Sequence, residues 1–183
     1  MSLYLWTGKY LKNNFYNQIE TLNLKESTHY IIEATADWVQ IKSIWELLWH
    51  NDYLWVSRTN FTKEKIQRSI KKALLLQWTP YDFLFNYYSD KNLVCSELIL
   101  KSYSKDTKED TSIEIELQEI WFWVTFPPHN FMKILLKEQK KQYPNIVPVF
   151  FIDSEEKTWR NFISTTEKFL QTIHRPRFSI FLK

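Results

Sequence analysis

Glycine is almost absent from this chain of 183 residues, and its absence constrains how the backbone can turn. Gly8 is the single glycine, whereas nine tryptophans are present. Average usage of about 7% predicts on the order of 13 glycines in a chain of this length. Turns at positive φ favour glycine, because a bulky residue there costs roughly 1–2 kcal/mol. The chain must therefore turn through other residues or carry strain.

Several tryptophans stand where the backbone is expected to need glycine. Asp37-Trp38 lies between two strand-like runs, where Asp-Gly would form a tight hairpin turn. One hypothesis is that many of the nine are native glycines, encoded by UGA codons that were rendered as tryptophan. It predicts that Trp6, Trp38 and Trp78 are more exposed than core tryptophans. The alternative is a tryptophan-rich core, to which three others would contribute: Trp121, Trp123 and Trp159.

The rest of the composition predicts a single globular domain over residues 1–183. A formal net charge of +3, spread along the chain, argues against a nucleic-acid partner. A single cysteine excludes an intrachain disulfide, and with four scattered histidines it shows no metal-ligand spacing, so no metal or cofactor is expected. No apolar run can span a bilayer and no signal-peptide pattern is present, so we expect a cytoplasmic protein without stable membrane insertion. The oligomeric state is not indicated.

Cys95 stands where an extended segment, residues 92–94, turns into an amphipathic helix that continues to about Tyr103. The unpaired N–H groups at a helix start carry partial positive charge, which favours a thiolate over a thiol. Cys95 is therefore a candidate nucleophile. The alternative is that this lone cysteine between apolar residues is a small core residue.

Two motifs change the balance between these interpretations. Pro80 is followed by Tyr81-Asp82-Phe83, and the helix begins with Cys95-Ser96-Glu97-Leu98. Together they resemble the signature of circularly permuted papain-fold thiol hydrolases, the YiiX-like branch of the NlpC superfamily. The likeness extends to residues 28–34 and, less clearly, to residues 175–178, and the family has glycine where Trp78 stands. It implies an α+β fold in which a small, mainly antiparallel sheet packs against helices.

The resemblance also implies a mechanism and its residues. Cys95 would attack a carbonyl and form an acyl-enzyme, while Glu33 would orient the histidine that carries the proton. The backbone N–H of Cys95, with the Tyr81 hydroxyl, would stabilise the oxyanion, and Asp82 and Ser96 would lie beside the pocket. The substrate would carry an amide or related acyl bond, in a cell-wall peptide or a lipid-like molecule. From the residues alone, Glu33 has a second interpretation, in which simple alternation points it to solvent.

The histidine of this mechanism is the uncertain part. In the resembled family it opens a strand similar to Ser2–Leu5, and Met1 stands about where the next residue would be. We therefore expect the chain to lack an N-terminal strand with that histidine. Alternatively the protein starts here and is an inactive papain-like binding module, or it uses His29, which shares a strand face with Glu33. The other histidines are expected to be structural or solvated: His50, His129 and His174.

Alternation and helical periodicity predict the following elements. Strands are expected over residues 2–5, 30–34, 39–42, 53–58, 113–117, 121–126 and 146–152, with Gly8–Leu11 continuing the first. Helices are expected over residues 43–50, 62–76, 95–103 and 127–139. A last long helix is expected through Leu170, with Asp153 and Glu156 as its capping box.

Overall fold

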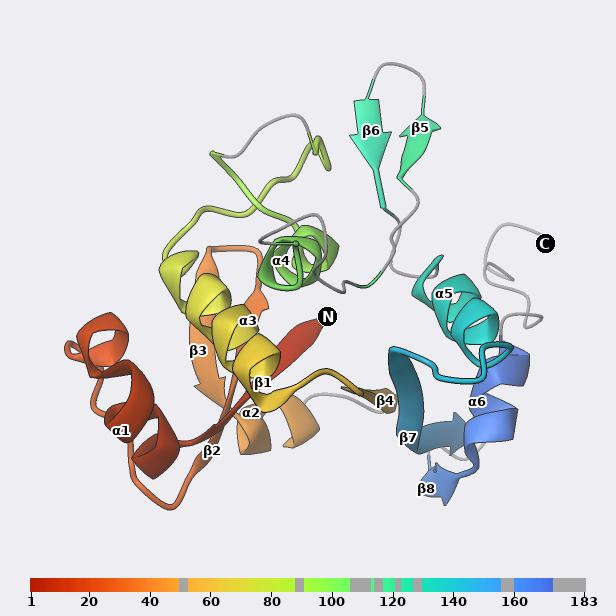
Figure 1. The fold of residues 1–183 in the computed structure, drawn as a ribbon, viewed down its shortest axis with the longest axis horizontal. Helices are drawn as coiled ribbons and strands as arrows, with labels where there is room; N and C mark the ends of the chain where they lie inside the picture. The colour runs from red at the N-terminus through yellow and green to blue at the C-terminus, as the bar shows by residue number, and fades with distance from the viewer. Residues whose placement is uncertain are drawn as a thin grey trace. The chain divides into compact units, whose positions relative to one another are not determined.

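The computed structural model describes most of the chain. The described residues are 1–49, 53–87, 91–105, 113, 117–120, 123–126, 130–155 and 160–172. They form two compact units, the first from Met1–His50 with Phe61–Pro128 and the second from Asn51–Asn60 with His129–Lys183. Helices and small antiparallel sheets make up the described parts (Figure 1), so the predicted α+β class is confirmed.

A three-stranded antiparallel sheet forms the centre of the first unit. Its strands β1 (Ser2–Thr7), β2 (His29–Ala34) and β3 (Val39–Ser43) lie in the order β1-β2-β3, and they confirm the strands predicted at these positions. Leu3 of β1 pairs with Ile32 of β2, and both side chains are buried. The apolar face of the sheet therefore belongs to the core of this unit.

Helix α1 (Gly8–Ile19) follows β1 directly, so the predicted continuation of the strand beyond Gly8 is wrong. Thr7 caps the helix, because its Oγ1 accepts a hydrogen bond from the backbone N–H of Tyr10 at 3.2 Å. Gly8 is required here by close approach: a Cβ atom would lie 2.2 Å from the carbonyl oxygen of Lys25. The single glycine thus permits the direct turn from strand into helix.

Helices α3 (Lys63–Leu75) and α4 (Cys95–Ser102) lie side by side against the sheet (Figure 1). Both contact β1, and α4 also contacts β2. The apolar face of α3 belongs to the core, since Ile70, Ala73 and Leu74 are buried. Helix α4 begins at Cys95, as the sequence predicts.

Three shorter elements are also described in the first unit. Helix α2 (Ile44–Trp49) follows β3, and strands β5 (Gln118–Ile120) and β6 (Trp123–Thr125) form an antiparallel pair. Of the strand predicted over residues 113–117, only Ile113 and Leu117 are described, and neither lies in a strand.

The second unit contains a second three-stranded sheet, in the order β4-β7-β8. Strand β7 (Ile146–Glu155) pairs antiparallel with both β4 (Leu54–Thr59) and β8 (Arg160–Ser164). Helices α5 (Asn130–Glu138) and α6 (Thr166–Gln171) pack against β7. Aromatic rings from these elements contact one another: Trp55, Phe131, Phe151 and Phe169.

The prediction of one long helix after Asp153 is wrong. Asp153 lies inside β7, and β8 occupies residues 160–164 before α6 begins at Thr166. Thr165 caps that helix, whereas Glu156 lies outside the described residues. A few apolar residues in a short run fit both the helical and the strand period. The pattern alone therefore does not distinguish the antiparallel strands β7 and β8 from one helix.

Most of the described tryptophans are exposed. Trp6, Trp38 and Trp78 are 46%, 42% and 57% exposed, as expected, but Trp45 and Trp49 are more exposed still, at 68% and 87%, while the ring of Trp55 stacks on Phe169. Trp6 (φ 94°) and Trp78 (φ 69°) adopt the left-handed conformation that glycine tolerates best. Trp38 is not among the described residues with positive φ. Trp121 and Trp159 lie outside the described residues, and only the backbone of Trp123 is described.

Candidate active site

Cys95 is the first residue of α4, and its side chain is half-buried. Val94 before it is extended (φ −90°, ψ 163°), and its carbonyl oxygen accepts the first helical bond, from the N–H of Leu98 at 3.0 Å. The thiol therefore lies beside the unpaired N–H groups of the helix start and remains accessible to solvent. Cys95 is therefore not a sealed core cysteine, and it stays the candidate nucleophile.

The segment before Cys95 is held by the loop that contains Tyr81. The N–H of Leu93 donates to the carbonyl oxygen of Pro80 at 2.9 Å, and the N–H of Asp82 donates to that of Leu93 at 3.2 Å. The buried Asp82 carboxylate accepts the backbone N–H groups of Leu84 at 2.9 Å and Asn86 at 2.7 Å. Asp82 thus stabilises the conformation of the loop by accepting hydrogen bonds from its backbone.

The same loop is tied to the end of the sheet. Val39, at the start of β3, donates its N–H to the carbonyl oxygen of Thr79 at 2.8 Å and accepts from the N–H of Trp78 at 2.8 Å. Val39 also pairs with Ala34, the last residue of β2. Sheet end, loop and nucleophile are therefore linked by a chain of backbone hydrogen bonds, although they are far apart in the sequence.

Glu33 lies at this end of the sheet, one residue before β2 ends. Its Oε1 is 3.1 Å from the Nζ of Lys42 on β3, and Ser2 of β1 is its direct partner on the other side. The side chain is half-buried and paired, so it is not simply a solvated residue of an alternating strand.

His29 lies at the opposite end of β2, four residues or about 13 Å along the strand from Glu33. Its Nδ1 is hydrogen bonded to the hydroxyl of Tyr4, on which its ring also stacks. The structure therefore separates His29 from the sheet end that is linked to Cys95. The other histidines lie outside the described residues: His50, His129 and His174.

Tyr81 is close to the nucleophile. Burial raises the pKa of its phenol, and the electrostatic effects of Cys95 and Asp82 raise it further. The phenol is accordingly protonated at neutral pH and is able to donate a hydrogen bond. Its ring also contacts the rings of Phe83, at 5.0 Å between centroids, and Phe85, at 6.2 Å.

Ser96 is turned into the interior. Its hydroxyl donates to the carbonyl oxygen of Phe126 at 2.9 Å and is hydrogen bonded to the hydroxyl of Tyr87. Burial raises the pKa of Tyr87 far above its usual range. Ser96 therefore ties α4 to the segment after β6, and the structure does not aim it toward a substrate.

Glu97 is a buried carboxyl group for which the sequence suggested no role. It follows Cys95 by two residues, and burial raises its pKa to about 7, although Lys101 and the N–H of Val94 act in the other direction. The signal was available, because a glutamate at the third helical position is one half of a capping box. It was missed because Val94 is not the serine or threonine that completes that motif.

The arrangement contains a thiol and hydrogen-bond donors, which are groups that acyl transfer requires. A helix-start thiol and backbone N–H groups lie beside a phenol donor, and a paired carboxylate lies at the linked sheet end. Within the described ranges, no three side chains of His, Cys, Asp or Glu cluster as metal ligands. The helices described also include none long and apolar enough to cross a bilayer.

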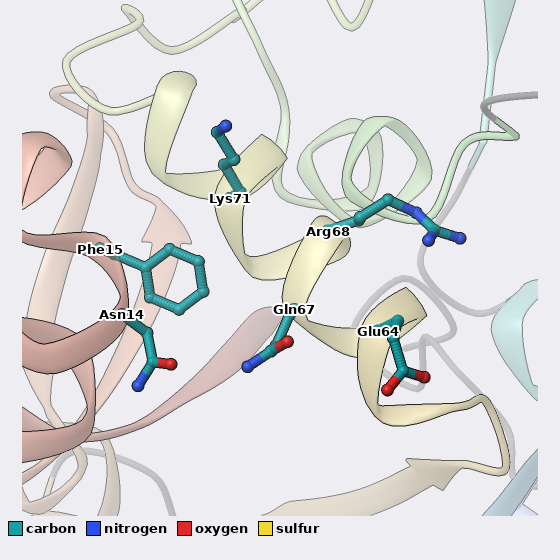
Figure 2. Close-up of a pocket in the computed structure, with 6 residues that line it drawn as sticks. All are labelled: Asn14, Phe15, Glu64, Gln67, Arg68 and Lys71. Atoms are coloured by element: carbon teal, nitrogen blue, oxygen red, sulfur yellow. The ribbon is translucent and has the colours of Figure 1, made fainter.

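A hollow of about 320 Å³ lies elsewhere in the first unit, between α1 and α3 (Figure 2). Its lining comes from two side chains of α1 and four of α3: Asn14, Phe15, Glu64, Gln67, Arg68 and Lys71. None of the predicted site residues lines it, so it is separate from the candidate active site.

Comparison with known proteins places the chain in a family. Residues 2–155 match the family of permuted papain-like amidase enzymes that includes YaeF and YiiX, also called C92. No curated protein and no solved structure matches the chain. The family match covers most of the sequence and contains Glu33, Tyr81 and Cys95. The chain therefore belongs to the C92 family of permuted papain-like amidases.

Proposed function

We propose that the chain hydrolyses an amide or related acyl bond through a thioester on Cys95. Membership in a family of papain-like amidases supports a cysteine hydrolase, without identifying its substrate. The observation that carries the proposal is the half-buried thiol at the first position of α4. Such a thiol is accessible to a substrate and adjacent to unpaired N–H groups, which can stabilise the oxyanion of an attacked carbonyl.

The reaction has two steps. The Cys95 sulfur attacks the carbonyl carbon, a C–S bond forms, and the amine leaves with a proton as the C–N bond breaks. Water then attacks the thioester, which releases the carboxylic acid and restores the thiol. The N–H of Cys95 and the protonated phenol of Tyr81 stabilise the oxyanion in both steps. The resemblance implies a histidine oriented by Glu33 as the proton carrier; His29, the histidine within the described residues, lies at the other end of β2 and is not that group.

An apolar acyl group is the substrate feature we propose. The loop beside Tyr81 exposes large apolar side chains, with Phe83 66%, Leu84 73% and Phe85 46% exposed. Phe83 and Phe85 contact the Tyr81 ring, so this surface begins next to the nucleophile. Contiguous exposed apolar residues commonly mark a binding surface. They favour a lipid-like acyl chain over a polar cell-wall peptide.

The test uses two anilides that differ in acyl length, the acetyl and octanoyl p-nitroanilides. We expect kcat/KM for the octanoyl compound to be higher by roughly ten-fold or more, because each buried methylene contributes about 0.8 kcal/mol. Phe83→Ser should reduce that preference, whereas Leu75→Ser, which alters an exposed leucine of α3, should preserve it. Turnover that persists in Cys95→Ala would overturn the proposal.

The second candidate is a papain-like binding module without catalysis. It is favoured by the position of His29, which lies away from Glu33 and from the sheet end linked to Cys95. In this case the octanoyl compound would bind, as measured by quenching of tryptophan fluorescence, without release of p-nitroaniline by either wild type or Cys95→Ala.

A further inference from the structure

The helix start that carries Cys95 differs from the other capped helix starts in the described chain. Helices α1, α3 and α6 each begin after a threonine whose Oγ1 accepts a backbone N–H three residues on: Thr7, Thr62 and Thr165. Helix α4 begins after Val94, which has no polar side chain and makes no side-chain cap. The turn on which the proposed chemistry depends therefore needs another cap.

Glu97 is the candidate for this cap. It is the third residue of α4, the position from which the glutamate of a capping box reaches the N–H of the residue before the helix, and the N–H of Val94 acts to lower its pKa. The serine or threonine that usually completes this motif is replaced here by Val94. Glu97 is 1% exposed, and within the described chain its Oε2 has no hydrogen-bond partner. Burying a carboxyl group is costly unless hydrogen bonds or a charged partner compensate for the lost hydration, so a specific contact at this position is expected.

The groups around Glu97 are already engaged with other partners or lie at a distance from the cap. Lys101, one turn along α4, has its Nζ 3.5 Å from the Glu97 Oε1. From the preceding loop, Asp82 bonds backbone N–H groups and Tyr87 bonds Ser96.

The elements packed against α4 add further charged groups. From α3, Lys65 and Lys72 donate to the carbonyl oxygen of Ser104, beyond the other end of α4. From β2, Glu33 pairs with Lys42, and His29 bonds Tyr4, the ionisable side chain of β1. None of these bonds involves the N–H of Val94.

We propose that Glu97 is a positioning residue, which holds the first turn of α4 closed around the Val94 N–H and thereby fixes the Cys95 thiol against the N–H groups of the helix start. The inference rests on the proposed function, because it concerns the same nucleophile. Burial raises the pKa of Glu97 to about 7, so near pH 6 the carboxyl is mostly protonated. Glutamine, which is neutral and keeps an acceptor oxygen, should therefore replace it.

The test measures the rate of Cys95 alkylation by iodoacetamide at pH 6 on the whole chain, so it does not depend on any acyl substrate. Glu97→Met keeps an unbranched side chain of similar length and removes the acceptor. We expect it to slow alkylation roughly five-fold, the effect of losing one cap, whereas Glu97→Gln should restore the wild-type rate. Glu138→Met, at another buried glutamate that accepts a backbone N–H, is the matched control and should leave the rate unchanged.

The outcomes separate this inference from the proposed function. Slow alkylation of Cys95 in Glu97→Met, with a wild-type rate in Glu97→Gln, supports the positioning role, even if the anilides are not hydrolysed. Equal alkylation rates for wild type and Glu97→Met overturn it, even if Cys95 proves to be the nucleophile. Equal slowing in Glu97→Met and Glu138→Met also overturns it, because a general loss of stability would then explain both.

Discussion

At the scale of single residues, the backbone at Trp6 and Trp78 adopts a conformation that suits glycine. Both side chains are also about half exposed, so only part of each ring is buried in return for the unfavourable φ. The sequence predicted this exposure from turn chemistry. It does not follow that either residue is a native glycine, and that hypothesis stays a prediction which the codons of the gene would test.

Replacing these tryptophans by glycine should stabilise the protein. We expect Trp6→Gly and Trp78→Gly each to raise the free energy of unfolding by about 0.5–1.5 kcal/mol, because relief of positive-φ strain exceeds the entropy that glycine adds to the unfolded chain. Urea denaturation measures the change. Trp45→Gly is the control, since Trp45 is similarly exposed but helical, and it should destabilise by about 0.5–1 kcal/mol. Loss of stability in all three variants would contradict the strain argument.

Residue patterns identify a candidate nucleophile more readily than the roles of the residues around it. Cys95 was recognisable because it is the only cysteine and stands at a helix start. Asp82 and Ser96 occur in the same motifs, but the structure turns one to backbone N–H groups and the other to Phe126. A sequence motif does not show which way a side chain points, so the two roles could not be distinguished beforehand.

At the scale of elements, the loop before α4 connects the sheet to the start of that helix. It pairs with β3 on one side and with the segment before Cys95 on the other. Helix α4 and strands β1, β2 and β3 could be predicted from periodicity, whereas their antiparallel sheet was implied only by the family resemblance. The direct turn from β1 into α1 could not, because it depends on a close backbone approach at Gly8 that the sequence does not reveal. The hairpin formed by β7 and β8 was hidden by a run of apolar residues that fits both periods.

Replacing Asp82 by alanine should lower both the stability of the protein and the reactivity of the Cys95 thiol. Asp82→Ala leaves the N–H groups of Leu84 and Asn86 without their acceptor, so we expect the free energy of unfolding to fall by roughly 2–3 kcal/mol. Iodoacetamide should also react more slowly with Cys95. Glu46→Ala removes an exposed carboxylate that caps α2, and it should cost about 1 kcal/mol with no change in alkylation. An Asp82→Ala protein with normal stability would show that the loop does not depend on this carboxylate.

At the scale of the whole molecule, the α+β class and the family were accessible from the sequence because two specific motifs lie in one chain. The division of the described residues into two compact units was not foreseen, and the prediction of one domain is not tested by it. The source of the catalytic histidine also stays a prediction. Neither its presence ahead of Met1 nor a replacement role for His29 follows from the described geometry.

Global stability should depend on the protonation of Glu97. Its pKa is raised from 4.5 to about 7 in the folded protein, so the stability contributed by the protonated form is complete below about pH 4.5 and is lost as the pH rises through about 7. We expect the free energy of unfolding to fall by roughly 1–3 kcal/mol over this range, since one pKa unit corresponds to about 1.36 kcal/mol. Glu97→Gln should lack this loss. Urea titrations at pH 5 and pH 8 measure the difference, and an identical pH dependence in wild type and Glu97→Gln would contradict the assignment.

The central claim is that Cys95 forms a covalent acyl intermediate. Its most direct test is intact-mass spectrometry of the protein, quenched in acid after brief incubation with p-nitrophenyl octanoate, followed by peptide mapping. We expect one added octanoyl group, located on the peptide that contains Cys95 and absent from Cys95→Ala. Equal acylation of Cys95→Ala, or no adduct on the wild-type cysteine peptide, would contradict it.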